Sequence, residues 1–183
     1  MKRVTRQEIL DYVTYEEQRK QIREKIMKIK ELRRINVAGV LSFLFENTDT
    51  LRYQIQEMIR VERMVKETDI LHDMNTYNEL LGDSGELGCT LLIEIDDPDE
   101  REEKLTQWLD LPKHLYLSLE DESRIRTSFD ERQIGDARLS SVQYIKFNTG
   151  GKTPVAIGSD LPLLKAETAL TADQKKALSE DLF

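Results

Sequence analysis

The sequence contains few of the residues from which metal and redox centres are built. It has one cysteine, Cys89, and two histidines, His72 and His114. A single cysteine excludes a disulfide within the chain, and iron–sulfur clusters and cysteine-based zinc sites need several thiolates. The two histidines are far apart, and neither belongs to a Glu-x-x-His or His-Glu-x-x-His motif. We therefore expect no metal site and no cofactor.

Long apolar runs are also missing. No stretch approaches the roughly 18 consecutive apolar residues that suggest a membrane-spanning helix. Residues 1–8 are rich in charge and lead into a charged segment, whereas a signal peptide continues into an apolar one. These two absences predict that the protein does not associate with membranes and that it is cytoplasmic.

The overall charge argues against one class of partner. The 183 residues carry 27 basic and 35 acidic side chains, a formal net charge of −8, and the pI is near 5.0. Domains dedicated to nucleic-acid binding usually carry net positive charge, so we do not expect a nucleic-acid partner. The first 36 residues differ from the rest, because they hold 11 basic and 6 acidic side chains. We interpret this basic segment first as a solvated helix face.

The hydrophobic pattern predicts an α+β fold. Apolar residues recur at helical spacing over 15–33, 48–66 and 68–81, with a shorter helix near 5–12. After Gly82 the period changes to the alternation of half-buried strands, for example at Cys89, Leu91, Ile93 and Ile95. We expect an antiparallel meander sheet packed against an N-terminal helical layer, forming a single α+β domain over 1–147.

The last 36 residues differ in composition. Several turn-forming residues are concentrated there: Gly150, Gly151, Pro154, Gly158 and Pro162. Thr171 and Gln174 match the capping box that begins a helix. We expect residues 148–183 to form an extended C-terminal arm with a short terminal helix. Because the arm contains apolar residues, it should dock on the domain or on a partner subunit.

One polar residue falls on an apolar helix face. In the helix after Thr48, the apolar arc is formed by Leu51, Ile55, Met58, Ile59, Val61 and Val65. Glu62 projects to the centre of this arc and Gln54 lies inside it. A buried carboxylate needs a partner, so we expect Glu62 to be buried and bonded to Arg52 or, failing that, to Arg33 or Arg34. The pair would either fix helix packing or form a ligand site.

The strands predict a second candidate site. If Leu115, Leu117, Ile125, Thr127 and Phe129 face the core, the opposite face carries a basic and aromatic patch made of His114, Tyr116, Arg124, Arg126, Tyr144 and Lys146. Such a patch could hold an anion or an acidic partner. The simpler interpretation is an ordinary solvated sheet face.

The run from Leu44 to Arg63, LFENTDTLRYQIQEMIRVER, resembles the signature of an uncharacterised bacterial family, a domain of unknown function. The segments 77–81, 85–87, 91–95 and 142–147 fit the same family, so the resemblance spans roughly residues 3–147. It implies no established activity and no catalytic residues. Members often sit in gene neighbourhoods with rubrerythrin-like and iron–sulfur oxidoreductase-like proteins, which implies a redox-linked or iron-related setting.

Two functions follow as hypotheses. The first is a non-catalytic cytoplasmic accessory protein that binds a protein partner, because no nucleophile, ligand cluster or cofactor motif is recognisable. The second is a small-ligand or anion-binding protein, or an enzyme, that uses Glu62, Arg52 and Gln54 or the basic sheet face. The identity of the partner and the formation of a homo-oligomer stay open at this stage.

Overall fold

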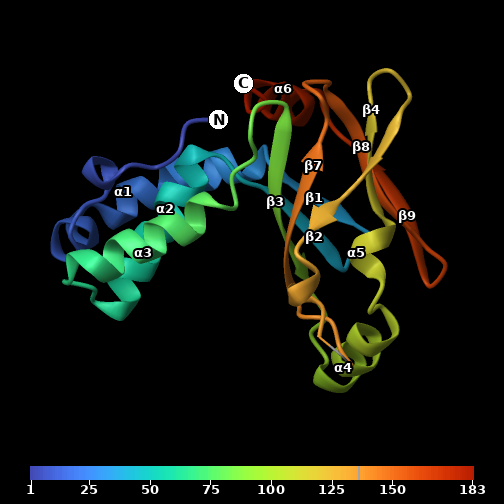
Figure 1. Cartoon of the computed structure of the whole chain (residues 1–183), viewed down its shortest axis with the longest axis horizontal. Coiled ribbons are helices and arrows are strands. Elements are labelled where there is room, and N and C mark those ends of the chain that lie inside the picture. Colours follow the sequence, from blue (N-terminus) through green and yellow to red (C-terminus); the bar gives the residue numbers. More distant parts are fainter. Residues whose placement is uncertain (136) are drawn as a thin grey trace.

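The protein consists of a layer of helices joined at one end to a body of strands (Figure 1). The computed structural model describes residues 1–135 and 137–183. The helical layer contains α1 (Tyr12–Glu31), α2 (Thr48–Glu62) and α3 (Glu67–Asn78), preceded by a 3-10 turn at Arg6–Glu8. No helix in the described part of the chain is long and apolar enough to cross a membrane.

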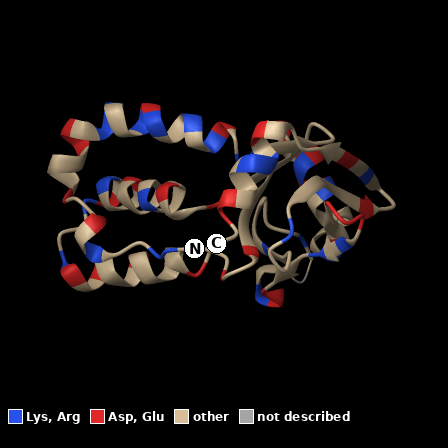
Figure 2. Ribbon diagram, turned by 90° about the horizontal axis from the view of Figure 1, so that it is seen from above, with Lys and Arg blue, Asp and Glu red and all other residues tan. Residues whose placement is uncertain are grey.

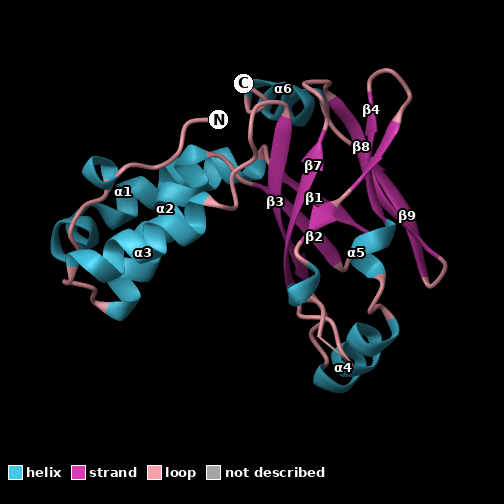
Figure 3. Ribbon diagram, in the orientation of Figure 1, coloured by secondary structure: helices cyan, strands magenta, loops and turns pink. Residues whose placement is uncertain are grey.

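The body of strands contains two antiparallel sheets, and we call it the β body (Figure 3). Sheet A has the order β1 (Arg34–Val37), β2 (Leu41–Phe45), β3 (Glu86–Ile93), β7 (Val142–Asn148) and β6 (Ser128–Phe129). Sheet B has the order β5 (Arg124–Arg126), β4 (Leu115–Leu119), β8 (Pro154–Leu161) and β9 (Leu164–Ala169). Three helices complete the body: α4 (Pro98–Gln107), α5 (Leu111–His114) and α6 (Ala172–Glu180).

The two sheets enclose the main hydrophobic core. Alternate residues of the paired strands point inward, so Phe43 lies opposite Leu91 and Cys89 lies opposite Ile145. Sheet B contributes the alternate residues of β4 and Ile157 of β8 to the same cluster. Burial of this apolar surface, at about 25 cal/mol per Å², is the main driving force for closing the two sheets on each other.

The edges of sheet A are completed by side chains. At β7, the amide of Gln133 accepts a hydrogen bond from the Tyr144 N–H (2.9 Å) and donates one to the Tyr144 carbonyl (3.1 Å). At β1, Gln174 donates to the Arg34 carbonyl at 3.0 Å and Thr168 donates to the Asn36 carbonyl at 2.9 Å. Thus two carbonyls of the edge strand β1 and the main chain of Tyr144, which lies on β7 beyond the end of the short β6, have partners within the chain.

The helical layer is flat, with α2 between α1 and α3 (Figure 2). Its small core contains Leu51, Ile55 and Ile59 of α2 and Ile70 and Met74 of α3. The segment before α1 is held by two side-chain amides. Asn78 bonds both main-chain groups of Val4, at 2.8 and 2.9 Å, and Gln56 bonds those of Leu10, at 2.6 and 3.1 Å.

On the α1 side of the layer, a carboxylate joins the two helices. Glu57 of α2 accepts hydrogen bonds from the Tyr15 hydroxyl at 2.6 Å and from the Arg19 guanidinium at 2.8 and 3.0 Å. Burial acts to raise the pKa of Glu57, but these hydrogen bonds outweigh it and hold the pKa below its usual value.

The joint between the layer and the β body depends on close main-chain packing. The chain leaving α3 crosses β3 so closely that a Cβ on Gly88 would lie 1.8 Å from the Leu80 carbonyl oxygen. A Cβ on Gly82 would lie 2.1 Å from the Glu86 carbonyl oxygen. Only glycine fits at these two positions, so the crossing depends on them.

A buried ion pair also lies at this joint. Arg33, at the end of α1, makes two hydrogen bonds to Asp181, the residue after α6, at 2.6 and 3.0 Å. Both side chains are only 9% accessible to solvent. The Asn47 amide contacts the same carboxylate at 3.4 Å. The ion pair therefore attaches the C-terminal end of the chain to the start of the β body.

The α+β class expected from the sequence is confirmed. Two elements differ from the expectation. The helix expected near 5–12 is only the short 3-10 turn, and α1 begins after Asp11, whose side chain caps it. Residues 148–183 contribute β8, β9 and α6 to the body, where β8 pairs with β4 and β9, in place of an extended arm. Their many glycines and prolines obscured the strand pattern.

Candidate functional site

Glu62 lies at the C-terminal end of α2 and is exposed to solvent. Among the described residues it has no hydrogen bond or ion pair, so the expected burial of this carboxylate is wrong. The helix ends at Arg63, which has a left-handed conformation with φ of 49°. Val61 and Val65 are 64% and 75% exposed. The predicted apolar arc therefore includes residues at and beyond the C-terminal end of α2 that are not buried.

The expected partners of Glu62 are bonded elsewhere. Arg52 contacts Asp49 at 2.8 Å and Glu8 at 3.1 Å. Hydrogen bonds from Thr5 are the main cause that lowers the pKa of Glu8 to about 2, and the charge of Arg52 adds to it. Arg33 is paired with Asp181. Gln54 is partly buried on α2 and has no hydrogen bond to Glu62 among the described residues.

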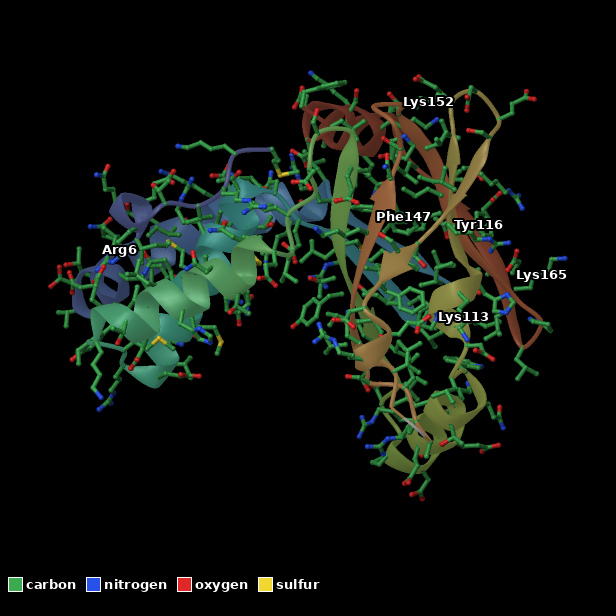
Figure 4. The ribbon with its side chains drawn as sticks, in the orientation of Figure 1. Arg6, Lys113, Tyr116, Phe147, Lys152 and Lys165 are labelled. Carbon is green, nitrogen blue, oxygen red and sulfur yellow. The ribbon has the colours of Figure 1, made fainter. Side chains whose placement is uncertain are left out.

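The structure divides the basic and aromatic patch into two parts. Arg124 and Arg126 lie on the outer face of sheet B, beside Tyr116, with cation–π distances of 4.4 and 5.7 Å. Tyr144 and Lys146 lie on the outer face of sheet A. Because the sheets face each other across the core, these outer faces point in opposite directions. Figure 4 shows Tyr116 on the side of the molecule that is farther from the helical layer. The expectation of one continuous patch is therefore wrong.

The sheet B part is electrostatically satisfied within the chain. Arg126 makes ion-paired hydrogen bonds to Asp160 at 2.5 and 3.0 Å, and His114 contacts the same carboxylate at 2.9 Å. The bonds from Arg126 and then His114 hold the pKa of Asp160 well below its usual range. Arg124 is paired with Glu167 at 3.2 Å. An anion arriving at this face would have to compete with two carboxylates.

The sheet A part lines a groove of about 650 Å³ between the helical layer and the β body. We call it the interlobe groove; in Figure 1 it lies between α3 and β7. One wall comes from α3 and the turn after it: His72, Asp73, Thr76, Tyr77, Glu79 and Leu80. The other comes mainly from β6, η2 (Glu131–Gln133), β7 and adjoining residues: Ser128, Phe129, Asp130, Gln133, Tyr144 and Lys146. Its volume is in the range of sites that hold ligands.

The two walls bring aromatic and charged groups together. Tyr144 is 41% exposed on β7. Burial is the main cause that raises the pKa of the Tyr77 phenol; Tyr144, Asp73 and Glu62 add to it, and Gln54 opposes it. Asp73, Tyr77 and Tyr144 all line the groove. Lys146 is 3.6 Å from Glu86, so its charge is partly neutralised.

Neither wall provides a recognisable catalytic centre. Within residues 1–135 and 137–183, no group of three or more His, Cys, Asp and Glu side chains could hold a metal ion. Cys89, which borders the groove, is buried, and burial raises the pKa of its thiol well above the usual value. A thiol in this state is a poor nucleophile. The groove is therefore suited to binding through aromatic, polar and charged contacts.

Of the residues predicted from the sequence, Tyr144 and Lys146 line the groove, Gln54 does not, and the wall formed by α3 was missed. Tyr77 is partly buried, packs against the helical core and also lines the groove. The available signal was the spacing of Asp73, Thr76 and Tyr77, which places them on one helix face. That face mixes polar and aromatic residues, so it differs from a simple core stripe.

Comparison with known proteins agrees with the resemblance seen in the sequence. No curated protein matches the chain. A crystal structure of a novel protein of unknown function from Burkholderia pseudomallei is similar over 100% of both chains, with a TM-score of 0.91 and 26% sequence identity. A family model described as "Protein of unknown function (DUF3501)" matches residues 3–182. The chain therefore belongs to the DUF3501 family, whose function is not known.

Proposed function

We propose that this chain is a non-catalytic, cytoplasmic accessory protein that binds a protein partner in the interlobe groove. The observation that supports the proposal most directly is the position of Tyr144, which stands partly exposed in a groove with walls from two parts of the chain. Tyrosine is enriched among the residues that contribute most to protein–protein binding, because it offers a large rigid surface and a polar hydroxyl.

The other candidate residues support a binding role elsewhere less well. Arg52, Arg124 and Arg126 all have carboxylate partners within the chain. An external anion would gain little from such side chains, since their charge is already compensated. The groove presents the partly exposed Tyr144 together with polar groups from both walls. The redox-linked setting implied by the resemblance is part of the proposal only as the cellular context in which the partner would be found.

The proposal is tested by site-specific photo-cross-linking in the native organism. A benzophenone amino acid replaces Tyr144 in one variant and Arg124, on the outer face of sheet B, in a matched control. We expect a discrete cross-linked species from position 144 and none from position 124. The species should disappear when Thr76→Trp fills the groove. No adduct at position 144, or equal adducts from both positions, would contradict groove binding.

A further inference from the structure

The charge of the interlobe groove indicates the chemistry of its occupant. Asp73 and Glu79, on the α3 wall, have no ion-pair partner among the described residues. Asp130, on the opposite wall, is already paired with Arg132 at 2.5 Å. Lys146 is the one lysine or arginine among the described residues that line the groove, and Glu86 partly compensates its charge. The free charge that an incoming group would meet is therefore negative.

Aromatic rings lie beside these carboxylates. Asp73 and Tyr77 are four residues apart on α3, a spacing that places two side chains next to each other on one helix face. Tyr144 of β7 and Phe129 of β6 line the same groove from the opposite wall. A cation over an aromatic face is attracted by the ring electrons, and a nearby carboxylate adds a direct electrostatic contact.

We propose that the occupant of the interlobe groove is a segment of a partner protein that inserts a lysine or arginine side chain between Tyr77 and Tyr144, with Asp73 and Glu79 as its counter-charges. This inference rests on the proposed function and names the chemistry of the partner. The α3 wall supports a polypeptide occupant, because Asp73, Thr76 and Tyr77 follow the i, i+3, i+4 pattern of helices that contact another chain, and Leu80 of the following turn extends this wall.

The test uses short synthetic peptides and the full chain labelled with nitrogen-15. Four peptides share the sequence Gly-Ala-X-Ala-Ala-Gly with X as Arg, Lys, Gln or Glu. We expect the Arg and Lys peptides to shift the amide resonances of 73–80 and 144–146 in a saturable manner, and the Gln and Glu peptides to leave them unchanged. Raising the salt concentration to 0.5 M should weaken the binding, because it screens exposed charges.

Three variants examine the named groups. The double change Asp73→Asn with Glu79→Gln should weaken binding of the Arg peptide about tenfold, the size expected from losing two partly exposed charge contacts. Asp99→Asn, an exposed acidic residue of α4 that does not line the groove, is the matched control and should leave the affinity unchanged. Lys146→Gln should tighten binding, because it removes a like charge and frees Glu86.

The outcomes separate this inference from the proposed function. Equal shifts with the Gln peptide would overturn the cationic occupant while leaving groove binding intact. No groove shifts with any peptide would overturn the inference, even if position 144 cross-links to a partner in cells. If arginine amide bound as tightly as the Arg peptide, the occupant would be a small amine and the inference of a protein segment would be overturned. If the benzophenone at position 144 gave no cross-linked species in cells, the proposed function itself would be overturned.

Discussion

The buried ion pair between Arg33 and Asp181 provides the sharpest stability prediction. Replacing Asp181 by alanine leaves the Arg33 guanidinium buried without its charge partner. Removing one member of a buried pair typically costs about 3–5 kcal/mol. The pair here has two short hydrogen bonds, at 2.6 and 3.0 Å, and both side chains are 9% accessible. We therefore expect a loss in the free energy of unfolding within that range.

One opposing effect reduces this value slightly. Asp181 follows the last turn of α6, where a negative charge is disfavoured by the helix dipole by about 0.3–1 kcal/mol. The expected loss for Asp181→Ala is therefore about 2–4.7 kcal/mol. Domains of this size are usually stable by about 5–15 kcal/mol, so the variant should remain folded but be clearly weakened. Replacing both residues, with Arg33→Met and Asp181→Leu, should recover much of the loss, because no unpaired charge remains.

Urea unfolding followed by tryptophan fluorescence measures these values directly. Trp108 is the one tryptophan of the sequence, and it is 3% exposed in the main core. The matched control is Asp110→Ala, which breaks the exposed pair with Lys113, whose side chains are 63% and 57% accessible. That change should cost less than about 1 kcal/mol. If Asp181→Ala cost no more than this control, the ion pair would not be the strong attachment that we infer.

Three further changes test other parts of the structure. The wild type should be more stable to unfolding than Glu57→Gln. This difference should be complete above the ordinary glutamate pKa of about 4.3 and should shrink as pH falls through the lowered pKa of Glu57. Urea unfolding between pH 3 and 7 measures it, and a difference that stays constant with pH would refute the prediction. Gly88→Ala should cost about 3 kcal/mol, because its Cβ meets the Leu80 carbonyl, and thermal unfolding should show a larger loss than for Gly39→Ala, whose Cβ meets nothing within 4 Å. Glu62→Ala should change stability by less than about 0.5 kcal/mol, and a loss of several kcal/mol would instead indicate a buried role.

Local patterns in the sequence predicted where helices and strands lie better than they predicted which side of each element is buried. The alternation at Leu115, Leu117 and Leu119 correctly identified β4, and the Thr171 capping box correctly identified the start of α6. The prediction of one basic and aromatic patch was wrong because the chain passes from β5 in sheet B to β6 in sheet A around Thr127. Alternation continues through this change, so no local pattern reveals which sheet each residue joins.

The groove was harder to predict because it depends on how two parts of the chain meet. Gly82 and Gly88 are visible in the sequence as turn formers, yet their role is to let two main-chain segments cross in contact. The angle of that crossing determines whether α3 covers the sheet or stands apart from it. The error at Glu62 has a simpler cause: Arg63 ends α2 without the glycine or asparagine that usually marks a left-handed helix end.

The side-chain bonds of Gln133, Gln174 and Thr168 have a consequence for the behaviour of the protein at high concentration. An open sheet edge is a template on which another chain can add a strand, and repeated addition leads to fibrils. Here the carbonyls of Arg34 and Asn36 and both main-chain groups of Tyr144 are already occupied. Copies of this chain therefore lack a ready site for strand addition at these points of sheet A.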